Sequence, residues 1–211
     1  DLGALIRTRG AEPGRRWSGS LELTGFWNEA RDLIVFLQNA QRILVPANLG
    51  RTQVRGLEAA VTGTLGEVLD THTGVTLTVS RNLSDDPAYA GNQLPRVPRW
   101  EVSHETALHR GDRVRAGYRF SYTGGNYWDA TNWYLAAPRA VHAVFFQVRP
   151  GRAWPLVEID VLNVTDRRVE VVPRNPLDPE DGSRVVQPIT DFAGYPLPGR
   201  TFLFSLRWNK G

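Results

Sequence analysis

Hydrophobic and polar residues alternate along most of this chain, which is typical of β-strands with one apolar and one polar face. In the clearest example, residues 114–122, Val, Ala, Tyr, Phe and Tyr alternate with Arg, Gly, Arg and Ser. Successive side chains of a strand point to opposite sides, so each set lies on one face. Alternation recurs at residues 75–79, 157–161 and 201–208, more weakly at 21–27, 57–65 and 100–108, and residues 2–9, 33–39 and 141–148 are read as further strands. The pattern predicts about ten strands.

Short and long connections between these strands alternate along the chain. Short connections are expected near residues 28–32, 66–68, 109–112 and 149–154, and long ones near 41–51, 82–98, 123–138 and 163–200. Up-and-down transmembrane barrels have this asymmetry, with short periplasmic turns and long extracellular loops. A soluble β-sandwich, the alternative, has no reason to sort its loops by end. We therefore predict an all-β, antiparallel, up-and-down β-barrel that crosses the bacterial outer membrane several times.

The last predicted strand, residues 201–208, follows the longest loop, so it should run from the outer side to the periplasm. Trp208 at its end would then lie in an interfacial aromatic girdle. Other aromatic residues also fall near predicted strand ends: Trp17, Trp27, Trp100, Tyr122, Trp128, Trp133 and Trp154. We favour the girdle over the core of a soluble domain because these residues cluster at strand ends.

The composition is compatible with a membrane barrel, although hydrophobic residues make up 41% of the chain and charged residues 22%. No stretch approaches the roughly 18 apolar residues of a transmembrane helix, but only alternate residues of a membrane β-strand face lipid. The chain has no Cys, which excludes a thiol nucleophile, a disulfide and a Cys-ligated metal. The net charge of +3 comes from interspersed residues, so no nucleic-acid partner is expected.

The C-terminal part contains Pro198-Gly199-Arg200, followed by a strand that ends on an aromatic residue. In this it resembles the end of TonB-dependent outer-membrane receptors. The resemblance implies that the barrel-assembly machinery recognises the closing strand, through its alternate residues Phe202, Phe204, Leu206 and Trp208. Three residues follow the aromatic residue, which departs from the family's pattern.

Further segments resemble the same family and occur in its order. Asn163-Val164-Thr165-Asp166 resembles the family's N-L-T-D segment, with Val in place of Leu. Three more matches lie upstream: residues 48–58 resemble an N-x-G … x-G-x-E segment, residues 94–98 an L-P-x-x-P loop end, and residues 125–129 an aromatic loop. The resemblance covers nearly the whole chain, although each motif alone is weak.

The resemblance implies a barrel of roughly 22 strands around a plug domain, whereas this chain supplies about ten strands and no recognisable plug. Residues 1–211 are therefore expected to be one C-terminal β-barrel segment, without the plug domain and the N-terminal strands. Three explanations stay open: a fragment, one polypeptide of a split receptor, or a reduced barrel that closes on itself.

By resemblance, the expected function is energy-coupled uptake of a scarce nutrient such as a siderophore complex or cobalamin, without enzymatic activity or a cofactor. The expected partners are outer-membrane lipid, a plug domain or companion chain that completes the barrel, the TonB energy-coupling complex and the barrel-assembly machinery. The alternatives are a structural barrel subunit, half of a split receptor, or a passive porin-like channel.

Two sets of residues are candidates for function. The first is polar, shares the inward-facing register, and could pair internally, contact a plug or simply be wetted: Glu22, Glu58, Glu101, Glu105, Arg113, Arg115, Arg119, Glu158, Asp160 and Arg207. The second set could contact an organic ligand or brace an outer loop: Tyr127, Trp128, Asp129, Asn132 and Trp133. No His spacing suggests a metal site and no nucleophile motif suggests catalysis, so neither is predicted.

Overall fold

The structure is a computed structural model, and it describes residues 2–12, 15–32, 34–38, 43–48, 50–151, 154–175, 178, 180, 182–190 and 195–208. Regular secondary structure in these residues is β-strand throughout. Across the same ranges, no helix is long and apolar enough to cross a membrane.

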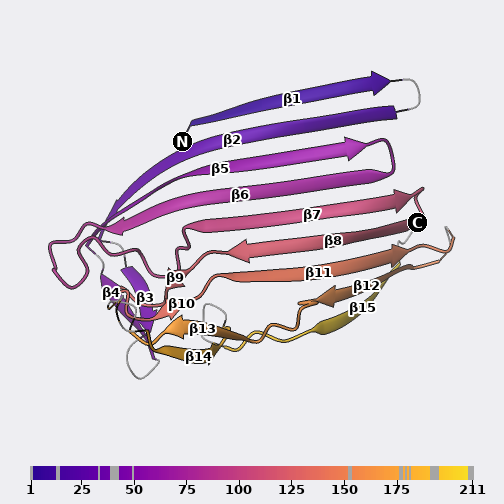
Figure 1. The fold of residues 1–211 in the computed structure, drawn as a ribbon. Helices are drawn as coiled ribbons and strands as arrows, with labels where there is room; N and C mark the ends of the chain where they lie inside the picture. The colour runs from indigo at the N-terminus through magenta and orange to yellow at the C-terminus, as the bar shows by residue number, and fades with distance from the viewer. Residues whose placement is uncertain are drawn as a thin grey trace.

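Nine strands of the described residues form one antiparallel sheet, in which each strand pairs with its neighbours in chain order. They are β1 (Leu2–Glu12), β2 (Arg15–Arg31), β5 (Arg51–Leu65), β6 (Leu69–Asn82), β7 (Trp100–Arg110), β8 (Val114–Thr123), β11 (Arg139–Val148), β12 (Leu156–Leu162) and β15 (Thr201–Arg207). Figure 1 shows them side by side as a single wall, from β1 at one edge to β15 at the other. This is the up-and-down order that the alternating pattern predicts.

The strand register separates the wall into two chemically different faces. Gly25 pairs with Leu57, Leu57 with Leu77, and Leu77 with Trp100, so one apolar face continues from strand to strand. This outer face exposes large apolar side chains, among them Leu23, Leu57, Val61, Leu108, Val144, Phe146, Ile159, Phe202 and Phe204. A water-soluble domain rarely exposes so many contiguous apolar groups, whereas lipid covers them in a membrane barrel.

The two ends of the wall carry connections of different lengths. Residues 66–68, 111–113 and 149–155 join strands at one rim, and residues 32–50, 83–99, 124–138 and 163–200 join them at the other. Gly66 and Gly111 have φ values of 56° and 57° in the short turns, a conformation that favours glycine. The C-terminal end of β15 lies at the short-turn rim (Figure 1), which confirms the predicted direction of the last strand.

Three of the four long connections contain small hairpins outside the main sheet. They pair β3 (Ile34–Gln38) with β4 (Leu44–Asn48), β9 (Asn126–Tyr127) with β10 (Leu135–Ala136), and β13 (Val169–Pro173) with β14 (Arg184–Pro188). All three hairpins gather at the same rim in Figure 1. The wall therefore carries its folded loops on one side of the membrane.

The region around residues 28–39 corrects two predictions. The expected short turn at 28–32 is instead the end of β2, which pairs with β5 as far as Arg31 and Arg51. The segment read as a wall strand at 33–39 contains β3, which belongs to a loop hairpin; Leu33 and Asn39 lie outside the described residues. Polar residues resemble a turn in sequence, but a strand that rises above the lipid can be polar without ending.

Candidate functional site

The long loops meet at their rim in a small apolar cluster. Leu94 from the connection between β6 and β7 packs on Ala130 from the connection between β8 and β11, and both are almost fully buried. Val54, Tyr89 and Val97 pack around this pair. Val54 belongs to β5 and lies on the inner face of the wall, so the loops fold inward over the lumen side.

Asp129 and Asn132, predicted as ligand-contact residues, have their polar groups occupied within the loops. The Asp129 carboxylate accepts hydrogen bonds from the backbone N–H groups of Tyr134 at 2.7 Å and Trp133 at 3.2 Å. Asn132, in the left-handed region with φ 57°, exchanges two 2.9 Å hydrogen bonds with the backbone of Gln93. Both residues therefore brace the loop, which was the alternative interpretation of this set.

The aromatic members of the same set are differently placed. The backbone N–H of Arg96 donates a hydrogen bond to the Tyr127 carbonyl at 2.7 Å. The guanidinium carbon of Arg96 lies 5.9 Å from the centre of the Trp128 ring. Trp133 and Tyr134 remain exposed, at 43% and 58%. The surface that this loop presents is therefore aromatic, while the polar atoms of Asp129 and Asn132 hold its shape.

A second contact joins the β13–β14 hairpin to the loop between β8 and β11. Glu170 on β13 is only 2% exposed. Its carboxylate accepts hydrogen bonds from Gln187 Nε2 at 2.6 Å and from the Ala137 backbone N–H at 3.2 Å. A buried carboxylate needs such donors, so Glu170 couples two loops that are distant in sequence. Sequence reasoning missed this residue because only the hairpin's packing buries it.

The inner face of β7, β8 and β12 carries a connected line of charges. Glu105 accepts from Arg115 at 2.6 Å and from Arg119 at 2.9 Å, and Arg119 also reaches Asp160 at 2.8 Å. Asp70 on β6 extends the line through His109 and Arg115. Sequence reasoning missed Asp70 and His109, although both lie on the inward register of their strands.

An aromatic ring lies under this charge line. The guanidinium carbons of Arg115 and Arg119 lie 4.7 and 4.2 Å from the centre of the Phe145 ring. Phe145 itself packs over Gly117, where a Cβ atom would clash with the ring. Glu158 forms a separate 2.9 Å pair with Arg207. Four predicted inward residues, Glu22, Glu58, Glu101 and Arg113, form no ion pair with other described residues.

The segment before the closing strand is held by contacts between two segments that are distant in sequence. We call this set of contacts, made by Val164, Asp166, Arg168 and Arg200, the clasp. The Asp166 carboxylate accepts from the Arg200 backbone N–H at 2.7 Å and from Arg168 Nε at 2.9 Å. Arg200 in turn donates to the Val164 carbonyl at 3.0 Å. A Cβ atom at Gly199 would overlap the side chains of Asp166 and Arg168, which would have to move to accommodate it.

These contacts also lower the pKa of the Asp166 carboxyl group. The Arg200 backbone hydrogen bond, followed by the Arg168 guanidinium, holds the pKa of Asp166 below its usual value. The carboxylate therefore stays ionised at neutral pH. Its stabilisation is lost only as the pH falls through this lowered pKa.

Three of the four predicted closing-strand residues share the outer face. Phe202 and Phe204 pair with Val161 and Ile159 of β12, and Leu206 pairs with Val157. With Trp208 they are all exposed, as lipid-facing residues are. Recognition of these residues by the assembly machinery stays a prediction. Within the described ranges, no group of three or more His, Asp or Glu residues could hold a metal ion.

A wall with an apolar outer face, a charged inner face and all long loops at one rim defines the class: an outer-membrane β-barrel. The family model described as TonB dependent receptor-like, beta-barrel matches residues 10–154. The chain belongs to this family, which confirms the resemblance seen in the sequence. No curated protein matches the chain significantly.

Solved structures of transporters and receptors have the same fold. The ferric yersiniabactin uptake receptor FyuA from Yersinia pestis matches with a TM-score of 0.62 and 16% identity, over 95% of this chain and 33% of that one. The siderophore receptor PiuA from Acinetobacter baumannii matches at 0.56 and 19%, over 73% and 24%. The copper transporter OprC matches at 0.57 and 17%, over 95% and 30%. The chain thus spans a third or less of their length.

Proposed function

We propose that this chain forms barrel wall, outer loops and closing strand of a receptor for energy-coupled uptake of a scarce nutrient across the outer membrane. The observation that carries this proposal is the folded loop assembly above a charged inner wall, in a chain of the TonB-dependent receptor family. Candidate nutrients are a siderophore complex or cobalamin. No chemical step is assigned to the chain.

Within this function, the aromatic loop at residues 126–136 is the proposed ligand contact. Of the predicted residues, Trp133 is the best placed, because its ring is exposed beyond a loop that Asp129 and Asn132 hold in shape. Tyr127 and Trp128 are partly covered and would line the base of the contact. Aromatic surfaces with few polar groups suit an organic chelate.

The inner wall is proposed to face a plug domain. Closure of the barrel needs further strands, because β1 and β15 are both sheet edges with no partner on their outer sides among the described residues. We propose that these strands and the plug come from the same receptor, either from one polypeptide or from a companion chain. A companion chain would co-purify with this one under conditions that keep the barrel intact.

Uptake by cells that depend on this protein tests the function. Cells would be supplied with radiolabelled ferric siderophores or cyanocobalamin, with and without a protonophore. Energy-coupled transport predicts accumulation that the protonophore abolishes, and Trp133→Ala should raise the half-saturating concentration several-fold. Tyr195→Ala, an exposed aromatic residue of another outer loop, is the matched control.

The alternatives give different results in the same assay. A passive channel would let small solutes equilibrate whether or not the protonophore is present. A structural subunit would give no uptake of any labelled nutrient, although the protein is present in the outer membrane. Either result would contradict the proposed receptor function.

A further inference from the structure

The outer face of β2, β5 and β6 changes character toward the long-loop rim. Leu57 and Leu77 face lipid in its apolar part. Two residues further toward the rim, the facing positions are Trp27, Arg55 and Val79, which are paired across the three strands. Aromatic and cationic side chains mark the boundary between lipid tails and headgroups. Long loops are extracellular in such barrels, so this boundary lies in the outer leaflet.

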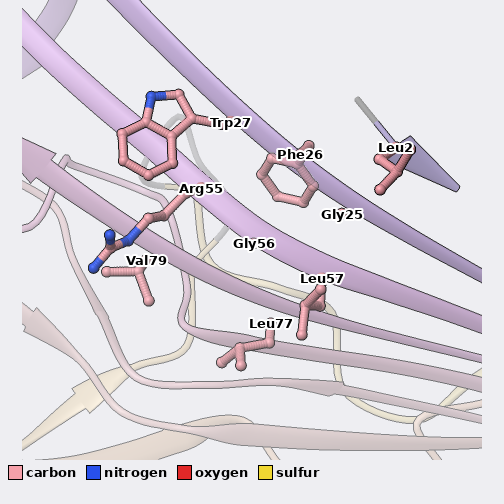
Figure 2. Close-up of a pocket in the computed structure, with 9 residues that line it drawn as sticks. All are labelled: Leu2, Gly25, Phe26, Trp27, Arg55, Gly56, Leu57, Leu77 and Val79. Atoms are coloured by element: carbon pink, nitrogen blue, oxygen red, sulfur yellow. The ribbon is translucent and has the colours of Figure 1, made fainter.

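A groove crosses the wall just below this boundary. Gly25 has no side chain there, and the resulting space of about 590 Å³ is lined mainly by apolar residues, among them Leu2, Trp27, Leu57, Leu77 and Val79. Figure 2 shows Trp27, Arg55 and Val79 toward one end of the groove, and Leu2, Leu57 and Leu77 toward the other. The groove is therefore apolar along its length and cationic at its rim end.

Two arginines at the rim end lack an acidic partner among the described residues. Arg55 is exposed, and its guanidinium carbon lies 5.5 Å from the centre of the Trp27 ring. Arg81 is also exposed and pairs in register with Gln53, so it occupies the position diagonal to Arg55 on the same face, where Cα atoms are typically about 7–8 Å apart. Arg51, by contrast, is neutralised by Glu29 at 2.7 Å. Arg55 thus stands at the rim end of the groove, and Arg81 lies just beyond it, two residues past Val79 on β6.

We propose that this groove binds a phosphorylated glycolipid of the outer leaflet, of the lipid A type. An acyl chain would lie along the groove over Gly25, and a headgroup phosphate would meet Arg55 and Arg81. Arg forms strong, charge-assisted hydrogen bonds with phosphate. The contact with Trp27 holds the Arg55 side chain on the wall and so favours binding.

Charge argues against a second copy of this chain as the occupant. A two-fold interface through the groove would bring Arg55 and Arg81 of one copy close to the same residues of the other. Like charges that face each other in a membrane interface are unfavourable. An anionic lipid neutralises the same two residues and also fills the apolar space.

Titration of the delipidated protein, extracted from outer membranes, with diphosphorylated lipid A tests this proposal by native mass spectrometry. Lipid A should bind more tightly than phosphatidylethanolamine. The double variant Arg55→Gln/Arg81→Gln should weaken lipid A binding about tenfold or more, since charge-assisted contacts are lost. Gly25→Leu should weaken it as well, because a Cβ atom at Gly25 fits in ordinary contact and a longer side chain would fill the groove.

Arg110→Gln is the matched control, because Arg110 is an exposed arginine of the same face at the opposite rim. It should leave lipid A binding unchanged. Heat-modifiable migration on gels checks that each variant is folded, and the single variant Arg81→Gln replaces the double variant if that one fails to fold. Equal binding of lipid A by the wild type and the arginine variant overturns the proposal. Equal affinity for lipid A and phosphatidylethanolamine also overturns it. So does a protein dimer that the Gly25→Leu substitution abolishes.

Discussion

At the scale of single residues, the wall uses glycine where another group occupies the space of a Cβ atom. Phe26 lies across Gly56 and Phe145 across Gly117, so an aromatic ring of the neighbouring strand covers each glycine. Such aromatic–glycine pairs help to fix strand register. Gly199 serves a different purpose, because it leaves room for the Asp166–Arg168 ion pair at the entry to β15.

Substitution of Gly199 tests the clasp. Gly199→Ala should displace the exposed side chains of Asp166 and Arg168 and lower the urea midpoint slightly, because both side chains can move into solvent at the cost of their mutual contacts. Urea unfolding of the protein in lipid vesicles would measure the change. Gly182→Ala is the control, because nothing lies within 4 Å of a Cβ atom there. Equal unfolding midpoints for the two variants would show that the clasp does not stabilise the fold.

At the scale of elements, the ion pairs of Glu105 and Asp160 on the inner face join three strands. Glu105 of β7, Arg115 and Arg119 of β8 and Asp160 of β12 are linked although β11 separates β8 from β12. The small inward residue of β11 at this level, Ala143, pairs with Arg119 and leaves space for its side chain to reach Asp160. The charges therefore connect strands that share no backbone hydrogen bonds.

Substitution of Arg119 should show how much the ion pair with Asp160 contributes to stability. Arg119→Ala leaves Asp160, whose side chain is only 11% exposed, without its cation. We expect a loss of about 1–2 kcal/mol in the free energy of unfolding, less than for a fully buried pair because Arg119 is partly solvated. Arg51→Ala, which breaks an exposed pair with Glu29, should cost about 0–1 kcal/mol. If the two variants lose the same stability, the inner pair contributes no more than a surface pair.

At the scale of the whole molecule, the chain is an outer-membrane wall with one lipid-facing side and loops folded over the other. Its apolar outer face lies in lipid, and its charged face meets the aqueous interior. The two sides therefore tolerate opposite substitutions. Adjacent residues of one strand can show this difference most directly, because they point to opposite sides.

Phe204 and Ser205 of β15 provide that comparison. Phe204→Arg places a charge on the lipid-facing side, at a cost of up to about 2–4 kcal/mol if the position is near the bilayer centre. Ser205→Arg places the same charge on the inner face, beside Glu158. The fraction of heat-modifiable, membrane-inserted protein should fall for Phe204→Arg and stay near the wild-type level for Ser205→Arg. The opposite order would reverse the assignment of the two faces.

The sequence alone determined the main architecture. Period two along residues 114–122, and the alternation of short and long connections, were sufficient to predict an antiparallel membrane wall and the direction of its last strand. These features are readable because the alternation of side chains is a local property, and lipid on one face imposes it on every strand. The Pro198-Gly199-Arg200 lead-in also indicated the family that the family model then confirmed.

Tertiary structure decided which groups meet. It moved residues 34–38 from the wall into a hairpin, showed that Asp129 and Asn132 brace a loop, and placed Gly199 against Asp166. It also placed Arg55 at one end of an apolar groove, with Arg81 just beyond it on the same face. Each of these contacts joins residues of different strands or loops, or depends on how a segment pairs. Register and loop packing arise from non-local hydrogen bonds and contacts, which a local pattern of residues does not encode.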